Sequence, residues 1–176
     1  MTQREALRDL QTRLAERMNA ARTEARPASW LAVEAGGAGF LFPLGEAGEI
    51  FALTDLMPLP HTQPWFCGVA NLRGGLHGVV DLAAFLGLRR EAPVDPANRE
   101  MVRLLALNPS LGALCALRVD RLAGLRNAEQ LVAEPAAPGP RPSFARGCWR
   151  DAQGHVWQEI DLAALAANEQ FLAIAT

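Results

Sequence analysis

The chain has 176 residues, of which half are apolar and 20% are charged, and its formal net charge is −2. This length favours one domain, or at most two small ones, that folds without disulfides or a structural metal. A pI near 5.9 argues against nucleic acid as the main partner, because phosphate recognition needs a strongly basic face. All 17 basic residues are Arg, and Ala and Leu supply 32 and 26 residues against nine Val and three Ile. That composition alone favours helix over strand.

The first 26 residues predict an amphipathic helix. Leu7, Leu10, Leu14 and Met18 recur at spacings of three and four, and Pro27 ends the segment. The segment carries six Arg and four acidic residues, and several of these Arg lie four positions apart, where like charges repel. Two interpretations remain open: a helix packed on its own domain, or a helix that docks on an acidic partner or a membrane surface.

After Pro27 the sequence predicts a β-rich domain. Short apolar runs are broken by Gly, Pro and Asn about every eight to twelve residues, a spacing typical of sandwiches and barrels. Glycines at 36–39 and 74–75 predict hairpin turns, and four prolines within 135–142 predict an extended loop. The predicted strands are 30–34, 40–43, 50–53, 66–73, 76–80, 101–107, 113–119, 123–130, 145–150 and 155–160.

Two segments of the chain resemble each other in sequence, and this internal repeat is called the echo below. Residues 71–86 and 151–166 align at an offset of 80 positions, and they share a turn glycine and the run Asp-Leu-Ala-Ala that begins at Asp81 and Asp161. In both copies a strand runs into an Asp whose carboxylate can cap a following helix. The echo predicts two similar β units, each closed by a short helix.

Sequence signatures of catalysis are missing: the chain has no phosphate loop, GxGxxG, GxSxG or HExxH motif, and no lysine for a Schiff base. The three dispersed histidines predict no metal site. We interpret the unpaired cysteines as buried apolar thiols: Cys67, Cys115 and Cys148. A thiol nucleophile at Cys67 is the enzymatic alternative. Three Asp that follow predicted strands are interpreted as caps or turns: Asp81, Asp120 and Asp161.

Arg73 stands at the end of a predicted apolar strand, directly before Gly74 and Gly75. A guanidinium on a rigid strand end beside bare backbone suits bidentate recognition of a carboxylate. Two alternatives remain open: this carboxylate belongs to a protein partner, or it belongs to a nearby Asp or Glu of the same chain.

The segment 68–88, GVANLRGGLHGVVDLAAFLGL, resembles the signature of CheW-like chemotaxis coupling proteins, in which a GVxNLRG run precedes a strand and the pair Asp-Leu. The resemblance covers nearly everything after Pro27. It includes 48–50, which resembles the V-x-E-I segment of the family, and 116–123, which resembles its VVDxV element. The N-terminal extension, the HTQPW run, the GVAN form of the signature and the ending EQFLAIAT resemble the CheW-like adaptors of type IV pilus twitching systems.

The resemblance implies a mainly β fold of two SH3-like five-stranded barrels that share a core, with short helices after the barrels. It divides the chain into an N-terminal helical extension, residues 1–27, and a CheW-like domain of two intertwined barrel subdomains, residues 28–176. It implies a non-catalytic adaptor, without cofactor or metal, that couples a methyl-accepting chemoreceptor to a CheA-type histidine kinase. The implied circuit is twitching motility signalling, and the alternative is a flagellar or other chemosensory array.

The resemblance also implies partners and site residues. The partners are the cytoplasmic tip of the receptor and the regulatory domain of the kinase, with array assembly as an option. We expect no nucleic acid, no membrane insertion and a cytoplasmic location at membrane-associated arrays. The implied site residues are Gly68, Asn71 and Arg73 for receptor binding and Ala47, Glu49 and Ile50 for kinase binding. Ala47 replaces the usual Val, which leaves the exact kinase contact open, and 75–78 is richer in glycine than the usual apolar strand.

Overall fold

The computed structural model describes residues 11–13, 29–90 and 94–176. Strands dominate the described residues and form two sheets, as predicted. The terminal barrel consists of β1 (Ser29–Ala35), β2 (Ala38–Pro43), β8 (Arg121–Asn127), β9 (Leu131–Glu134), β10 (Ala145–Asp151) and β11 (Val156–Ile160). The central barrel consists of β3 (Ala47–Ala52), β4 (Phe66–Leu72), β5 (Gly75–Asp81), β6 (Arg103–Leu107) and β7 (Cys115–Val119).

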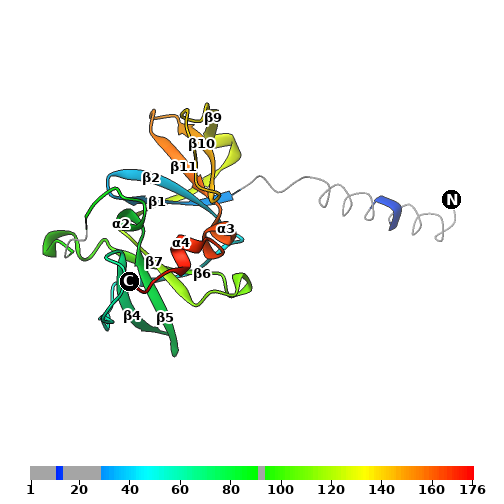
Figure 1. Cartoon of the computed structure of the whole chain (residues 1–176). Coiled ribbons are helices and arrows are strands. Elements are labelled where there is room, and N and C mark those ends of the chain that lie inside the picture. Colours follow the sequence, from blue (N-terminus) through cyan, green and yellow to red (C-terminus); the bar gives the residue numbers. More distant parts are fainter. Residues whose placement is uncertain (1–10, 14–28, 91–93) are drawn as a thin grey trace.

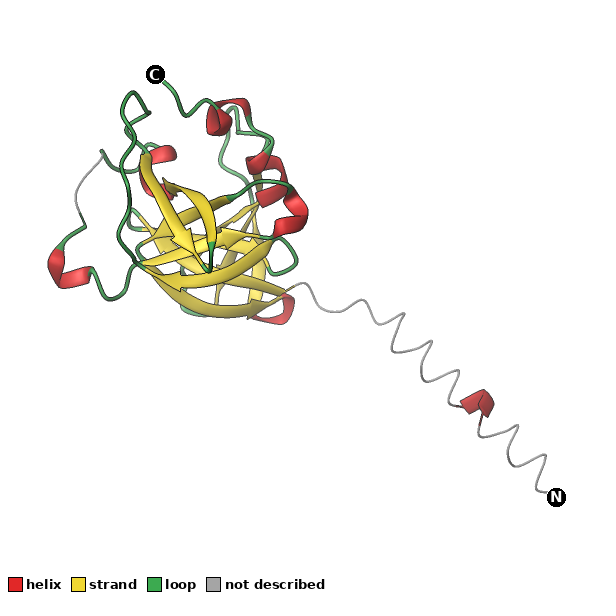
Figure 2. Ribbon diagram, turned by 90° about the horizontal axis from the view of Figure 1, so that it is seen from below, coloured by secondary structure: helices red, strands yellow, loops and turns green. Residues whose placement is uncertain are grey.

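The helices are short and lie around the sheets. They are α2 (Leu82–Phe85), α3 (Leu162–Ala166), α4 (Glu169–Leu172) and the 3-10 turns η1 (Pro96–Asn98), η2 (Pro109–Leu111) and η3 (Ala128–Gln130). Figure 1 shows most strands of the terminal barrel above β4 and β5, with α2, α3 and α4 between the two groups. Figure 2 shows the strands gathered at the centre and the helical segments at the periphery. No helix in the part of the chain that the structure describes is both long and apolar enough to span a bilayer.

The two barrels repeat one topology. The strand orders are β8-β1-β2-β11-β10-β9 and β3-β6-β7-β5-β4, and their first five positions correspond. Each sheet contains one parallel pair at the equivalent place, β2 with β11 and β5 with β7. The single bridge of Met57 to Val69, beside β4, takes the place that β9 occupies beside β10. The internal echo therefore reflects a structural repeat.

The carboxylates that end the two repeats cap helices, as the sequence predicted. Asp81 accepts hydrogen bonds from the backbone N–H groups of Ala83 and Ala84, at 3.1 and 3.3 Å, at the start of α2. Asp161 accepts one from Ala164 at 2.8 Å at the start of α3. Asp120 caps no helix, but its Oδ2 accepts the N–H of Gly36 at 2.8 Å and so ties the β7–β8 link to the β1–β2 turn.

The core has three parts. The largest lies between the barrels and takes buried side chains from both, such as Leu31 and Phe42 from the terminal barrel and Leu105 and Leu117 from the central barrel. Each barrel also encloses its own apolar cluster: Trp30, Ala32, Leu41, Leu131 and Trp157 in the terminal barrel, and Ala70, Leu72, Val79, Leu104 and Ala116 in the central barrel. Two barrels around a shared core confirm the predicted fold class, although the terminal barrel has six strands instead of the predicted five because β9 adds to its edge.

A buried charge network crosses this junction. Asp81 is 1% exposed and pairs with the guanidinium groups of Arg118 and Arg89. Arg89 also reaches Asp120, with a distance of 2.7 Å between Nη1 and Oδ1. Since charges leave water only at a large cost in free energy, this network depends on its members staying paired. Asp120 carries the network to Gly36 in the terminal barrel.

A smaller network occupies the corresponding place beside α3. Arg146 lies 2.6 Å from Asp161 and 3.2 Å from Glu46, which stands between β2 and β3. Glu46 also accepts the N–H of Leu162 at 2.8 Å. The two carboxylates that cap α2 and α3, Asp81 and Asp161, are thus also paired with arginines beside the junction of the barrels.

Two details of the sequence prediction were wrong, and a third concerns residues that lie outside the described part of the chain. The predicted strand 123–130 ends at Asn127, whose side chain caps η3, and the chain then enters β9, which was not predicted. The first hairpin turn uses Gly36 and Gly37, both with positive φ, whereas Gly39 lies inside β2. The N-terminal helix lies outside the described residues, apart from the helical residues 11–13.

Candidate functional site

The signature hairpin turns at Arg73 and Gly74. Both residues have positive φ, 51° and 81°, and Leu72 pairs with Gly75 across the turn. This is the two-residue geometry that suits the twist of a hairpin. The predictions that Gly74 and Gly75 form the turn and that Arg73 ends the strand were therefore wrong by one residue. Arg73 projects from the tip of a hairpin.

Asn71 holds this turn. Its Oδ1 accepts the backbone N–H of Gly74 at 2.9 Å. Asn71 is exposed and pairs with Leu76 across the hairpin. The side chain of Asn71 thus stabilises the turn that follows it in the chain.

Gly68 is buried and allows two segments to approach each other. Its φ is +126°, and a Cβ at this position would lie 2.4 Å from the carbonyl oxygen of Met57. The neighbouring Val69 exchanges two backbone hydrogen bonds with Met57, each 2.8 Å long. The structure therefore gives Gly68 a role in packing, with no side chain to offer a partner.

Arg73 forms an ion pair with Glu49 of β3. The two side chains remain 77% and 42% exposed, so most of the guanidinium still faces solvent. The carboxylate of the same chain, one of the two alternatives, is thus present. An exposed pair of this kind contributes only about 0–1 kcal/mol to stability, which leaves both charges available to partners.

β3 presents the other candidate residues. It pairs with β6 through Ile50 to Leu105 and Ala47 to Leu107, with an irregularity between these pairs. Gly48 occupies the irregularity, since a Cβ there would lie 2.7 Å from the carbonyl oxygen of Ala106. Ile50 is partly exposed, whereas Ala47 packs against the shared core.

All six predicted site residues therefore lie on the central barrel, and the structure brings the two predicted sets together through the pair of Arg73 and Glu49. Four of them are at the surface: Glu49, Ile50, Asn71 and Arg73. Sequence reasoning missed Leu76, which is 63% exposed and opposite Asn71. Its signal was the glycine-rich start of the strand, where Leu76 is a large apolar residue directly after Gly74 and Gly75.

The terminal barrel repeats the apolar part of this surface without its charges. Leu125 pairs with Leu31 as Ile50 pairs with Leu105, and Leu125 is 63% exposed. Val156 is the echo partner of Leu76 and is also exposed.

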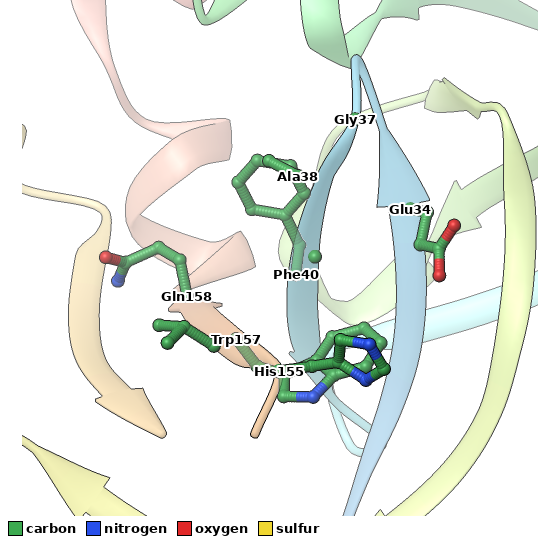
Figure 3. A pocket seen from close by; sticks show the side chains of 9 residues that line it. Glu34, Gly37, Ala38, Phe40, His155, Trp157 and Gln158 are labelled. Carbon is green, nitrogen blue, oxygen red and sulfur yellow. The ribbon is translucent and has the colours of Figure 1, made fainter. Parts of the chain in front are cut away.

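A separate groove of about 440 Å³ opens between β2 and β11 (Figure 3). Its lining residues are Glu34, Gly37, Ala38, Gly39, Phe40, His155, Val156, Trp157 and Gln158. Gly39 leaves room for the ring of Trp157, which would lie 2.6 Å from a Cβ. A hydrogen bond from Arg121 lowers the pKa of Glu34, whose two oxygens are 2.6 and 2.7 Å from that guanidinium. None of the predicted site residues lines this groove.

The cysteines differ from one another. None of the three, all of which lie in the described part of the chain, forms a disulfide, and each residue is partly exposed rather than fully buried as predicted. Burial raises the pKa of the Cys115 thiol to about 12. Cys148 lies 3.4 Å from a guanidinium nitrogen of Arg141 and donates to Gln158 at 3.1 Å. The thiol of Cys67 donates to the carbonyl oxygen of Trp65, with 4.0 Å between Sγ and that oxygen.

Two intertwined barrels of one topology define the class of the fold, and comparison with known proteins identifies its family. A family model for the CheW-like domain matches residues 29–170. Protein PilI of Pseudomonas aeruginosa is 30% identical over 169 residues, covering 93% of this chain and 89% of PilI. A probable chemotaxis protein CheW of Rhizobium etli is 27% identical over 120 residues, covering 66% of this chain and 74% of that protein. The chain belongs to the CheW-like domain family.

A solved structure shows the same fold. The scaffolding protein TtCheW from Thermoanaerobacter tengcongensis matches with a TM-score of 0.62 at 17% identity, over 76% of this chain and 88% of that protein. The family and the fold therefore both agree with the resemblance of segment 68–88 to the CheW-like signature.

Proposed function

We propose that the chain is a non-catalytic adaptor that couples a methyl-accepting chemoreceptor to a CheA-type histidine kinase, in type IV pilus twitching signalling. Membership of the CheW-like family and the likeness to PilI support this role. The observation that carries it is the exposed pair of Arg73 and Glu49, since it joins the residues expected to bind receptor and kinase in one surface. A cytoplasmic location at membrane-associated arrays follows from these partners.

The guanidinium of Arg73 is the sharpest test of receptor binding. Arg73→Glu reverses the charge at a side chain that is 77% exposed, so the fold should persist while receptor recovery in a pull-down falls. Arg99→Glu is the matched control, because Arg99 is also exposed and lies at the end of η1, outside the signature segment 68–88. Equal recovery of receptor by the wild type and Arg73→Glu would show that this surface does not bind the receptor.

A substitution on β3 tests the proposed binding of the kinase. Ile50→Arg places a charge on an exposed apolar side chain without disturbing the core, and it should reduce kinase recovery. The alternative circuit, a flagellar or other array, is separated by a deletion strain: loss of twitching with normal swimming supports the pilus system.

Array assembly is tested on the terminal barrel. Leu125 is equivalent to Ile50 and is exposed, which supports a second contact of similar shape. Leu125→Arg should then preserve binary binding of the kinase and reduce larger assemblies in sedimentation experiments.

The proposed division into residues 1–27 and 28–176 is tested by co-purification from cells with the full chain and with a chain lacking residues 1–27. The proposed enzymatic alternative is tested by thiol alkylation: if alkylated protein still couples kinase to receptor, Cys67 has no catalytic role.

A further inference from the structure

We propose that Asn71 is a positioning residue and not a partner contact: its side-chain amide holds the turn that presents Arg73 beside Glu49. This inference rests on the proposed function, because it concerns how the receptor-binding residue is placed. It also reassigns Asn71, which the family resemblance had grouped with the receptor-binding residues.

The turn needs such support. Arg73 has a φ of 51°, a left-handed conformation that residues with a Cβ disfavour. Gly74 follows at 81°, where glycine is unstrained. The hydrogen bond from Gly74 N–H to Asn71 Oδ1, 2.9 Å long, spans Arg73 and fixes the residues on both sides of it. Releasing that bond allows Arg73 to return to an ordinary conformation, in which its side chain points elsewhere.

The equivalent hairpin of the terminal barrel, β10–β11, supports this interpretation independently. Asp151 occupies the echo position of Asn71, 80 residues further on, and it also accepts hydrogen bonds from its own turn. Its Oδ1 accepts the N–H groups of Gln153 and His155 at 3.0 and 2.9 Å. The terminal barrel has Gln153 where the central barrel has Arg73, and no Glu49 equivalent. The side-chain acceptor thus recurs at the base of the turn even where the ion pair does not.

The charged partner fixes the direction in which Arg73 must point. Glu49 lies on β3, which stands at the opposite edge of the sheet from β4. The pair therefore forms only if the hairpin tip curls towards that edge. A residue that only contacted the receptor would not need a hydrogen bond with the turn, whereas the Oδ1 of Asn71 accepts one from the N–H of Gly74.

A double-mutant cycle tests the proposal with a purified cytoplasmic fragment of the receptor that the wild-type chain recovers. Asn71→Ala should weaken binding about fivefold, the effect of one ordinary hydrogen bond. In the Arg73→Ala background, Asn71→Ala should have no further effect, because the residue acts through Arg73. Asn71→Asp keeps the acceptor and should bind within about twofold of the wild type. An equal loss in both backgrounds would overturn the proposal and make Asn71 a contact.

Hydrogen exchange of the Gly74 amide, followed by NMR, tests the same proposal without a partner. Asn71→Ala should accelerate exchange about fivefold, and Asn71→Asp should not. Unchanged exchange in Asn71→Ala overturns the proposal. If Arg73→Ala binds the fragment as well as the wild type, the proposed receptor surface fails, and the exchange result alone then decides the role of Asn71.

Discussion

Glu49 and Arg73 form an ion pair between the two edges of one sheet. Glu49 lies on β3, and Arg73 follows β4, which are the first and last strands in the order β3-β6-β7-β5-β4. The sheet must therefore curl for the charges to meet, and the pair lies where the barrel closes. Residues expected to bind two different partners thus form one continuous surface, on which one partner can affect how the other binds.

A charge swap separates the two roles of this pair. Arg73→Glu or Glu49→Arg alone places like charges together, but the free energy of unfolding should fall by less than about 1 kcal/mol because both side chains are exposed. The double variant Glu49→Arg with Arg73→Glu should regain that small loss, measured by urea unfolding. Receptor binding should stay weak, because the guanidinium is now on β3. Restored binding would mean that the pair itself, and not the position of Arg73, is what the receptor requires.

Gly68→Ala should destabilise the fold strongly. The new methyl would lie 2.4 Å from the carbonyl oxygen of Met57, and the residue has a φ of +126°. Steric overlap and backbone strain together are expected to cost about 2–4 kcal/mol in the free energy of unfolding. Gly154→Ala is the matched control, since its φ is +85° but no atom lies within 4 Å of the added Cβ. The control should lose only about 1 kcal/mol, and equal losses would show that close approach to Met57 is not the cause.

Asp81→Asn should be among the most damaging isosteric changes. The amide can still cap α2, but the buried guanidinium of Arg118, whose side chain is 10% exposed, loses its counter-charge. Breaking a buried pair on one side costs about 3–5 kcal/mol, which thermal unfolding would measure. Asp161→Asn, at the equivalent cap, should cost much less because Arg146 is 41% exposed and can be hydrated. Similar losses at the two caps would argue that burial does not govern the difference.

The echo predicted more of the fold than the composition did. Gly74 and Gly154 have nearly the same φ, 81° and 85°, and Asp81 and Asp161 cap equivalent helices, all of which local sequence encodes. The Ala- and Leu-rich composition pointed to helix, yet Leu104, Leu105 and Leu117 lie in strands because packing overrides weak propensity. β9 escaped prediction because the turn before it contains neither Gly nor Pro.

The site was predicted less completely, since its geometry depends on contacts that are distant in sequence. Arg73 and Glu49 were both named, but their pairing depends on the curl of the sheet. Arg118 was overlooked, although an arginine inside the apolar strand β7 indicates a buried acidic partner. Gly68 was carried over as a binding residue, whereas only the path of Met57 beside it shows why glycine is required.

The carboxyl group of Asp161 makes stability depend on pH. Burial would raise its pKa, but hydrogen bonds from the Ala164 backbone and from Arg146 outweigh burial, and the pKa lies below its ordinary value of 3.8. A carboxylate with a lowered pKa in the folded state stabilises the fold above that ordinary value, and the stabilisation is lost as the pH falls through the folded-state pKa. Arg146→Gln removes one cause of the shift.

Arg146→Gln should therefore lower stability at pH 7 by at most about 1 kcal/mol, since the pair is partly exposed and screened by solvent. Its stability should also fall less steeply than that of the wild type between about pH 4 and pH 2, because less of the shift remains to be lost. Urea midpoints across this range measure both effects, with Arg99→Gln as the control for the loss of an exposed positive charge. Glu46 and Glu159 also face Arg146, at 3.2 and 3.6 Å, so their repulsion grows when the arginine is removed. A profile parallel to that of the wild type would mean that Arg146 does not hold the carboxyl of Asp161 in its charged form.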